Sequence, residues 1–382
     1  MTDLVGNWNY PTRIRFGQGR ISELADACAQ ADIKRPLLVT DRGLASLPVT
    51  GQVLEIMDQA GLGRASFSDV DPNPRDQNLE KGVHDFREGG FDGVIAMGGG
   101  SGLDLAKLIA FMAGQTRPVW DFEDVGDNWT RADADAIVPV VAVPTTAGTG
   151  SEVGRAAVIT NTRVHEKKII FHPRMMPSVV ICDPELTVGL PPAMTAGTGM
   201  DAFVHCLEAY CAPSYHPMAL GIGLEGMRLV KEYLPRAFQD GHDLEARAQM
   251  MSAATMGATA FQRGLGAIHS LAHAIGALHD CHHGTTNAIL APVVLRFNRP
   301  AIEDSVDRLA AYLGIDGGFD GFHRFVLDLN RQLQIPENLR ALGAEPGRID
   351  EYARLAIVDP TAPGNPVKLT LEAARKLYAE AL

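Results

Sequence analysis

Short apolar runs alternate with helix-like stretches through the first half of the chain. The runs are bounded by turn-forming residues, while the stretches between them repeat apolar positions at helical spacing. We expect strands at residues 35–41, 65–70, 93–97 and 138–143, and helices at residues 52–59, 79–89 and 103–112. Strands separated by helices predict an α/β fold with a parallel sheet that is covered on both faces.

The pattern changes after about residue 183. Long stretches rich in Ala, Leu, Met and Glu follow, with little of the alternation that β-strands show. We expect helices at residues 199–210, 217–233, 244–261 and 267–278. The chain is therefore predicted to form an α/β domain at residues 1–185 and an all-helical domain at residues 186–382.

Composition narrows the class of protein further. The 382 residues are 46% hydrophobic and carry a formal net charge of −12, which argues against a nucleic-acid-binding surface. No apolar run is long enough for a membrane span, and no signal peptide is evident. Five scattered cysteines without a C-x-x-C pair favour a reducing, cytoplasmic location.

Two loops in the first half have the composition of cofactor-binding loops. Gly98–Gly102 joins a predicted strand to a helix and would let the backbone approach a phosphate, although the run also fits a tight turn. Thr145–Ser151 is rich in hydroxyl groups and follows another strand. Asp41 ends the first strand, where it is either an ordinary turn residue or an acceptor for ribose hydroxyls. Together these loops favour a pyrophosphate-bearing cofactor.

The second half concentrates ionisable residues in apolar helices. Asp201 and His205 are spaced to share one helix face, as are His269 and His273, and His283 follows a short loop. Burying such groups costs free energy unless they are paired or bind a metal. A carboxylate with imidazoles suits a divalent transition metal such as Fe²⁺ or Zn²⁺.

Five motifs, in this order, resemble those of the iron-containing (group III) alcohol dehydrogenases. They are GGGSGLDLAK, PTTAGTGSEV, DPELTVGLPP, GMDAFVHCLEAY and GLGAIHSLAHAIGALHDCHHGTTNAILAP. The similarity extends from about residue 16 to about residue 366. It implies an NAD(P)-binding α/β domain followed by a helical metal-binding domain, an architecture that dehydroquinate synthases share.

The resemblance also implies roles for individual residues. The metal ligands would be Asp201, His205, His269 and His283, with His273 as a catalytic residue that handles the proton. The cofactor-binding residues would be Asp41, Gly98, Gly99, Gly100, Ser101, Asp104, Thr145, Thr146, Thr149 and Lys167. An ionised Asp41 would repel the 2′-phosphate of NADP, so we predict NAD. The resemblance favours Fe²⁺, while the ligand set suits Zn²⁺ as well.

The predicted reaction is hydride transfer between NAD and a small primary alcohol, diol or hydroxy acid. The alternatives are a zinc-dependent, glycerol dehydrogenase-like polyol oxidoreductase, a dehydroquinate synthase-like lyase, and a non-enzymatic protein that binds metal or nucleotide. The latter two are disfavoured, because basic residues are few near the ligands and because both complete sites occur in one chain. The resemblance also implies a homodimer, for which residues 8–16 offer an edge strand.

Overall fold

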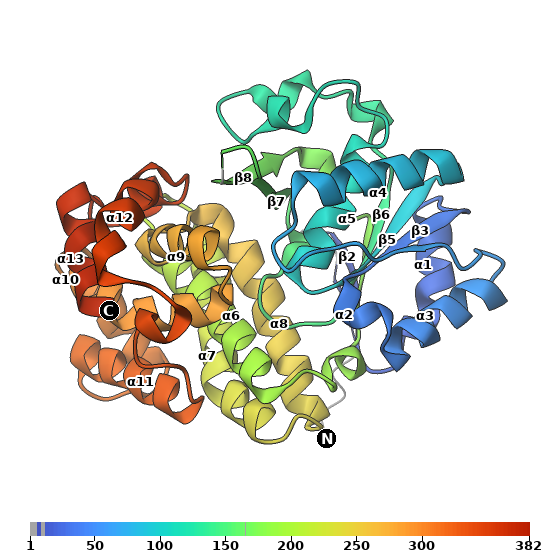
Figure 1. Ribbon diagram of the computed structural model, residues 1–382. Coiled ribbons are helices and arrows are strands. Elements are labelled where there is room, and N and C mark those ends of the chain that lie inside the picture. Colours follow the sequence, from blue (N-terminus) through green and yellow to red (C-terminus); the bar gives the residue numbers. More distant parts are fainter. Residues whose placement is uncertain (1–5, 9–11, 165) are drawn as a thin grey trace. The chain divides into compact units, whose positions relative to one another are not determined.

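The computed structural model describes residues 6–8, 12–164 and 166–382, and the chain divides into two compact units (Figure 1). The first unit contains Met1–Thr146 and Gly150–Gly189, and the second contains Ala147–Thr149 and Leu190–Leu382. Three residues that follow Thr145 and Thr146 thus belong to the second unit, although the chain on both sides of them belongs to the first. Each unit has its own secondary-structure class.

The first unit is built on a seven-stranded sheet. In spatial order its strands are β1 (Gly6–Trp8), β2 (Arg13–Phe16), β9 (Val179–Cys182), β6 (Val140–Pro144), β5 (Gly93–Gly98), β3 (Pro36–Val39) and β4 (Ser66–Phe67). Every neighbouring pair is parallel except β1 with β2. Every residue of β3, β5, β6 and β9 is buried, as expected for a parallel sheet covered on both faces.

In the described part of the first unit, five α-helices accompany this sheet. They are α1 (Leu24–Gln30), α2 (Arg42–Ala45), α3 (Pro48–Gln59), α4 (Asp76–Gly89) and α5 (Gly100–Met112). Helix α5 begins three residues before the expected start at residue 103, so two glycines of the loop lie in its first turn. One apolar core joins α1 and α3 to β3, β5, β6 and β9.

A separate antiparallel hairpin in this unit was not expected from the sequence. Its strands are β7 (Ala156–Asn161) and β8 (Glu166–Phe171). Helix α5 anchors it through Lys107, whose fully buried ammonium group donates to the carbonyl oxygens of Ser151 (3.0 Å) and Ala156 (2.5 Å). Burial lowers the pKa of Lys107, and the ion pair with Asp104 at 3.4 Å opposes that shift.

The second unit consists of helices joined by turns. Its α-helices are α6 (Pro192–Cys211), α7 (Pro217–Gln239), α8 (Leu244–Ala260), α9 (Ala267–His279), α10 (His283–Tyr312), α11 (Gly318–Gln332), α12 (Ile349–Val358) and α13 (Leu371–Ala381). Helix α6 is the central one, because it packs against α7, α8 and α10. Parallel sheet and helical unit together confirm the predicted fold class.

Glycines allow the helices around α6 to approach closely. A Cβ atom on Gly284 of α10 would lie 2.1 Å from the carbonyl oxygen of Gly197 on α6. A Cβ atom on Gly257 of α8 would lie 3.0 Å from the Cβ of His205. Backbone atoms cannot move aside as side-chain tips can, so these contacts set how α10 and α8 lie against α6.

Two expectations concern membranes and the N-terminus. Among the described residues, no helix combines the length and apolarity needed to cross a bilayer. The segment expected to form an intersubunit strand, residues 8–16, is only partly described, since residues 9–11 lie outside the described residues. On either side of that gap, β1 and β2 pair with each other, and β1 is an edge strand of the sheet.

The helical packing predicts opposite effects for two glycine substitutions. Gly284→Ala should lower the free energy of unfolding by about 1–3 kcal/mol, because the new methyl group meets backbone on α6. Gly221→Ala is the matched control, since Gly221 lies on the exposed side of α7 with open space around it. It should instead stabilise by roughly 0.5–1 kcal/mol. Urea unfolding of both variants tests this, and equal midpoints would contradict the close approach.

Candidate functional site

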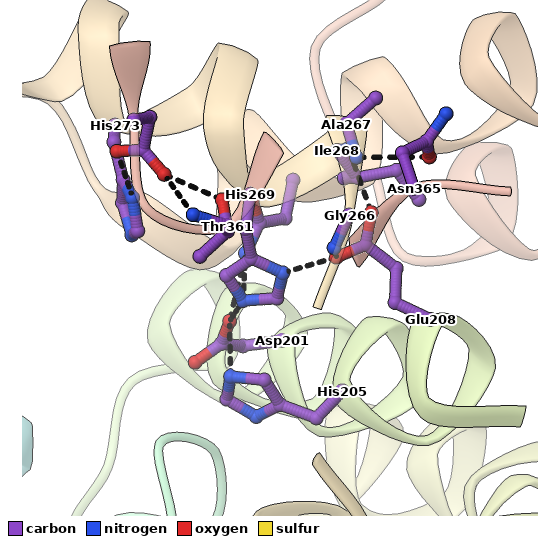
Figure 2. Close-up of polar contacts among 12 residues, drawn as sticks. Asp201, His205, Glu208, Gly266, Ala267, Ile268, His269, His273, Thr361 and Asn365 are labelled. Carbon is purple, nitrogen blue, oxygen red and sulfur yellow. Dashed lines mark hydrogen bonds and ion pairs between the residues drawn. The ribbon is translucent and has the colours of Figure 1, made fainter. Parts of the chain in front are cut away.

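Three helices bring the predicted metal ligands together in the second unit, and Figure 2 shows Asp201, His205 and His269 of this group. Asp201 and His205 lie one turn apart on α6, His269 lies on α9, and His283 is the first residue of α10. The side chains of Asp201, His205 and His269 are buried, and that of His283 is 31% exposed. Residues more than sixty positions apart in the sequence thus form one cluster.

The distances within the cluster suit a shared cation. The Oδ1 atom of Asp201 lies 3.8 Å from Nε2 of His205, 3.8 Å from Nε2 of His269 and 3.5 Å from Nε2 of His283. These separations are at or beyond the limit of a hydrogen bond. Two ligand atoms that are each bound to one tetrahedral metal lie about 3.4 Å apart. Asp201, His205 and His269 can each offer one ligand atom to the same ion, because these three atoms all lie within 4.8 Å of one another.

The electrostatics of the cluster agree with that geometry. Burial lowers the pKa of His269 well below its usual range, and the neighbouring His205 lowers it further. His269 is therefore neutral at physiological pH, which is the form that binds metals. The buried Asp201 carboxylate accepts a hydrogen bond from Asn287 Nδ2 at 2.8 Å. A buried carboxylate beside imidazole nitrogens is costly unless a cation balances it, so these residues fit a divalent metal.

His273 lies beside the ligands with a different partner. Its ring stacks on that of His283 at a centroid distance of 5.2 Å, and its Nδ1 atom is 2.9 Å from Oδ2 of Asp359. Asp359 also accepts hydrogen bonds from Thr361. Burial opposes ionisation of Asp359, but His273 and Thr361 outweigh it, so the pKa of Asp359 is lowered. A carboxylate thus orients His273 and leaves its Nε2 atom for other contacts.

The two remaining histidines of this segment have partners of their own. His279 Nε2 is 2.7 Å from the hydroxyl group of Tyr352. His282 caps α10, because its Nδ1 atom accepts the N–H of Thr285 at 3.3 Å. Both rings therefore have structural partners.

Sequence reasoning missed three residues at this site, namely the buried Glu208 and Asn287 and the partly buried Asp359. Glu208 Oε2 is 2.7 Å from Nδ1 of His269, and Asn287 contacts Asp201. A signal for Glu208 was present, because it is a charged residue in the apolar sequence of α6. Asp359 carried no such signal, since it lies in a turn far along the chain from His273.

In the first unit, the glycine loop meets Asp41 and Thr146 at the carboxyl ends of β3, β5 and β6. Gly98 has φ 148°, which a residue with a side chain rarely adopts. A Cβ atom there would lie 3.5 Å from Asp41 Oδ2, and one on Gly99 would lie 3.1 Å from Thr146 Cγ2. Gly99 has no side chain to cap α5, so the first N–H groups of this helix remain suited to an anion.

Three other predicted cofactor residues, Asp104, Lys167 and Ser101, form hydrogen bonds to groups of the protein itself. Asp104 accepts hydrogen bonds from the Ser151 hydroxyl group and from the Val158 N–H at 2.8 Å, so protein groups engage both of its oxygens. Lys167 on β8 donates to Asn73 Oδ1 at 2.7 Å, and the hydroxyl of Ser101 donates to the carbonyl of Pro72.

The threonine loop is divided between the units. The backbone N–H of Thr145 donates to the carbonyl of Gly98 at 3.0 Å, which ties the loop to the glycine turn. Thr149 belongs to the three residues that cluster with the second unit. The loop therefore contributes residues to both units.

Comparison with known proteins places these features in a family. Residues 11–184 match the family model for iron-containing alcohol dehydrogenase, and residues 195–382 match the model for the C-terminal part of the Fe-containing alcohol dehydrogenase family. The chain is 38% identical to 4-hydroxybutyrate dehydrogenase of Cupriavidus necator, over 98% of this chain and 99% of that protein.

Two further relatives are similar over nearly their whole length. NAD-dependent methanol dehydrogenase of Bacillus methanolicus is 33% identical, over 98% of this chain and 100% of that protein. A crystal structure of 1,3-propanediol oxidoreductase superimposes with a TM-score of 0.92 at 33% identity and covers 99% of both chains. The motifs, the fold and these matches agree, and the chain belongs to the iron-containing alcohol dehydrogenase family.

Proposed function

We propose that this alcohol dehydrogenase holds a catalytic Fe²⁺ through Asp201, His205, His269 and His283. The observation that carries the proposal is the group of three imidazole Nε2 atoms around the buried Asp201 oxygen. Zn²⁺ is the alternative that the same donor set accommodates. We assign the metal to a helical domain at residues 186–382 and the cofactor to an α/β domain at residues 1–185.

The proposed substrates are small alcohols with a second polar group, together with the corresponding aldehydes. Relatives named for 4-hydroxybutyrate and for 1,3-propanediol, both similar over nearly the whole chain, support hydroxy acids and diols. A relative named for methanol supports short primary alcohols as well. Among these classes we place ω-hydroxy acids first, because 4-hydroxybutyrate dehydrogenase shares the highest of these identities.

In the proposed mechanism, NAD supplies the hydride acceptor and the metal supplies a Lewis acid for the alcohol oxygen. Asp201, His205, His269 and His283 would hold this metal. His273 accepts the alcohol proton, directly or through water, since imidazole is suited to proton transfer near neutral pH. Asp359 holds the His273 ring in place at Nδ1, so the proton would be received at Nε2.

For the cofactor we propose NAD over NADP, bound at the Gly98–Gly102 turn. The carboxylate of Asp41 lies beside this turn and N-caps α2 by accepting the Leu44 N–H at 2.9 Å. Arg42, the adjacent residue that could attract a 2′-phosphate, is ion-paired with Asp71 at 2.7 Å and with Asp69. Both features disfavour the extra phosphate. We also propose that Thr145, Thr146, Thr149 and Lys167 contact the cofactor. Asp104 would act indirectly, because it accepts a hydrogen bond from Ser151 and so holds the threonine loop in place.

A cytoplasmic homodimer completes the proposal. The five cysteines are free, which supports a reducing compartment. The edge strand β1 offers unpaired backbone groups to a second copy.

Metal and activity should be lost together when a ligand is removed. The metal-loaded enzyme should reduce NAD with 4-hydroxybutyrate, 1,3-propanediol or a short primary alcohol. His205→Ala should lose more than the roughly 10–100-fold in metal affinity that loss of an outer-shell partner causes. Metal analysis of anaerobically prepared protein and NADH absorbance measure the two effects. His279→Ala, on the same helix as His269, is the control and should keep its metal. Activity that survived in metal-free His205→Ala would refute the Lewis-acid role.

His273→Ala should separate proton handling from metal binding. We expect full metal content and slower alcohol oxidation, by roughly 10²–10⁴-fold if His273 is a general base. The deficit should be largest at lower pH, because hydroxide, the alternative proton acceptor, becomes scarcer there. The pH profile of kcat with saturating NAD measures this. An unchanged profile would show that the proton leaves by another route.

Asp41→Gly should relax the preference between the two cofactors. Removing the carboxylate should improve kcat/KM for NADP relative to NAD by roughly 10-fold or more, since like charges about 4 Å apart repel by about 1–4 kcal/mol near a protein surface. Asp58→Ala, an exposed change on α3, serves as the control. Preference that stayed the same in Asp41→Gly would contradict the proposed ribose position.

A further inference from the structure

We propose that Glu208 is a positioning residue of the metal site, which fixes His269 in the tautomer whose Nε2 atom is free to bind the metal. This inference rests on the proposed metal site and extends it to a residue outside the ligand set. Glu208 lies on α6, two turns after Asp201, and is 6% exposed. Figure 2 shows its carboxylate between the His269 ring and the start of α9.

The tautomer follows from the hydrogen bond between the two side chains. Both oxygens of Glu208 accept backbone N–H groups, so this side chain acts as a hydrogen-bond acceptor, and its Oε2 atom is 2.7 Å from Nδ1 of His269. The Nδ1 atom must then carry the single proton of the neutral ring. The lone pair is left on Nε2, which is the atom that faces Asp201 at 3.8 Å.

The backbone holds the carboxylate itself in place. Oε1 accepts the N–H of Ile268 at 2.7 Å, and Oε2 accepts the N–H of Gly266 at 2.9 Å. These donors lie at the start of α9, where a helix leaves its first N–H groups without internal partners. Gly266 leaves room for this approach, since a Cβ atom there would lie 3.1 Å from Glu208 Oε1. Glu208 therefore joins the two helices that carry Asp201, His205 and His269.

In the described part of the chain, His205, the other buried histidine ligand, lacks a hydrogen bond like the one that His269 makes with Glu208. Its buried Nδ1 atom has no hydrogen-bond partner among the described residues, so no contact there selects a tautomer. The second carboxylate–histidine pair of the site, Asp359 with His273, orients a ring that the proposed function assigns to proton handling. Of the two buried ligand rings, His269 is thus the one that a carboxylate orients.

Asn365 offers a matched control for this role. Its Oδ1 atom accepts the N–H of Ala267 at 3.0 Å, between the two N–H groups that Glu208 engages, and the side chain is buried as Glu208 is. It supports the same turn of α9, and among the described residues its side-chain hydrogen bonds go to Ala267, Asn298 and Val367, not to the His269 ring. A purely structural role would make the two residues equivalent.

The test compares Glu208→Gln with Asn365→Ala. In Glu208→Gln, the amide must turn its NH₂ group either toward Ile268 N–H or toward Gly266 N–H and His269 Nδ1, and the second arrangement favours the wrong tautomer. We expect Zn²⁺ affinity, measured by chelator competition, to fall roughly 10–100-fold in Glu208→Gln. The Zn²⁺ affinity of Asn365→Ala should stay within about threefold of that of the parent protein. This difference should remain even if urea unfolding shows that both metal-free variants lose the same amount of stability.

Other outcomes would overturn the inference or the function beneath it. Equal losses of affinity in both variants, or unchanged affinity in Glu208→Gln, would show that Glu208 only supports the helix. Should Glu208→Gln fail to fold, ¹⁵N NMR of the histidine-labelled, zinc-loaded parent still decides. The inference requires a protonated Nδ1 on His269, and a protonated Nε2 would refute it. A parent protein that binds no divalent metal would instead refute the proposed metal site.

Discussion

A buried carboxylate that cannot remain without a cationic partner is the constraint on which the helical unit depends. Asp201 is buried on α6, and three imidazole nitrogens lie within 3.8 Å of its oxygen. Burial lowers the pKa of His269 well below its usual range, which disfavours a positive charge on that ring. A divalent metal satisfies the carboxylate and the imidazoles together, and its binding free energy adds to the stability of the three helices that carry them.

Backbone proximity makes this cluster geometrically attainable. Gly284 lies against Gly197, and Gly257 lies against His205, so α10 and α8 approach α6 without intervening side chains. Glu208 adds a polar connection, because one carboxylate satisfies two N–H groups of α9 and one ring of the site. Burial raises the pKa of Glu208 to about 7, and the hydrogen bonds from those backbone donors limit the rise to that value. Close packing thus holds α8 and α10 against α6, and the hydrogen bonds of Glu208 hold α9 against α6. Together these contacts fix the positions of the ligands.

Much of the fold was accessible from the sequence for identifiable reasons. The apolar strands before Asp41, Gly98 and Thr145 were expected because fully buried parallel strands are nearly continuous hydrophobic runs. The hairpin of β7 and β8 was not expected, since its partly buried residues, such as Lys167 and Lys168, lack a clear alternation. The start of α5 was placed late because glycines lower helix propensity, although a first turn tolerates them when it faces an anion.

The sequence alone predicted the α/β-then-helical order, two loops with the composition of cofactor-binding loops, and Asp and His pairs that share a helix face, because periodicity and spacing act along the chain. The choice of Asp201, His205, His269 and His283 as metal ligands came from the family resemblance. The sequence could not determine that Glu208 reaches His269, that Asn287 reaches Asp201, or that Asp359 reaches His273. Those contacts join residues at least 61 positions apart, and only the packing of α6, α9 and α10 with the turn after α12 brings them within hydrogen-bond distance. The tertiary structure therefore decided which polar groups orient the ligands, since such bonds depend on distances that no sequence interval encodes.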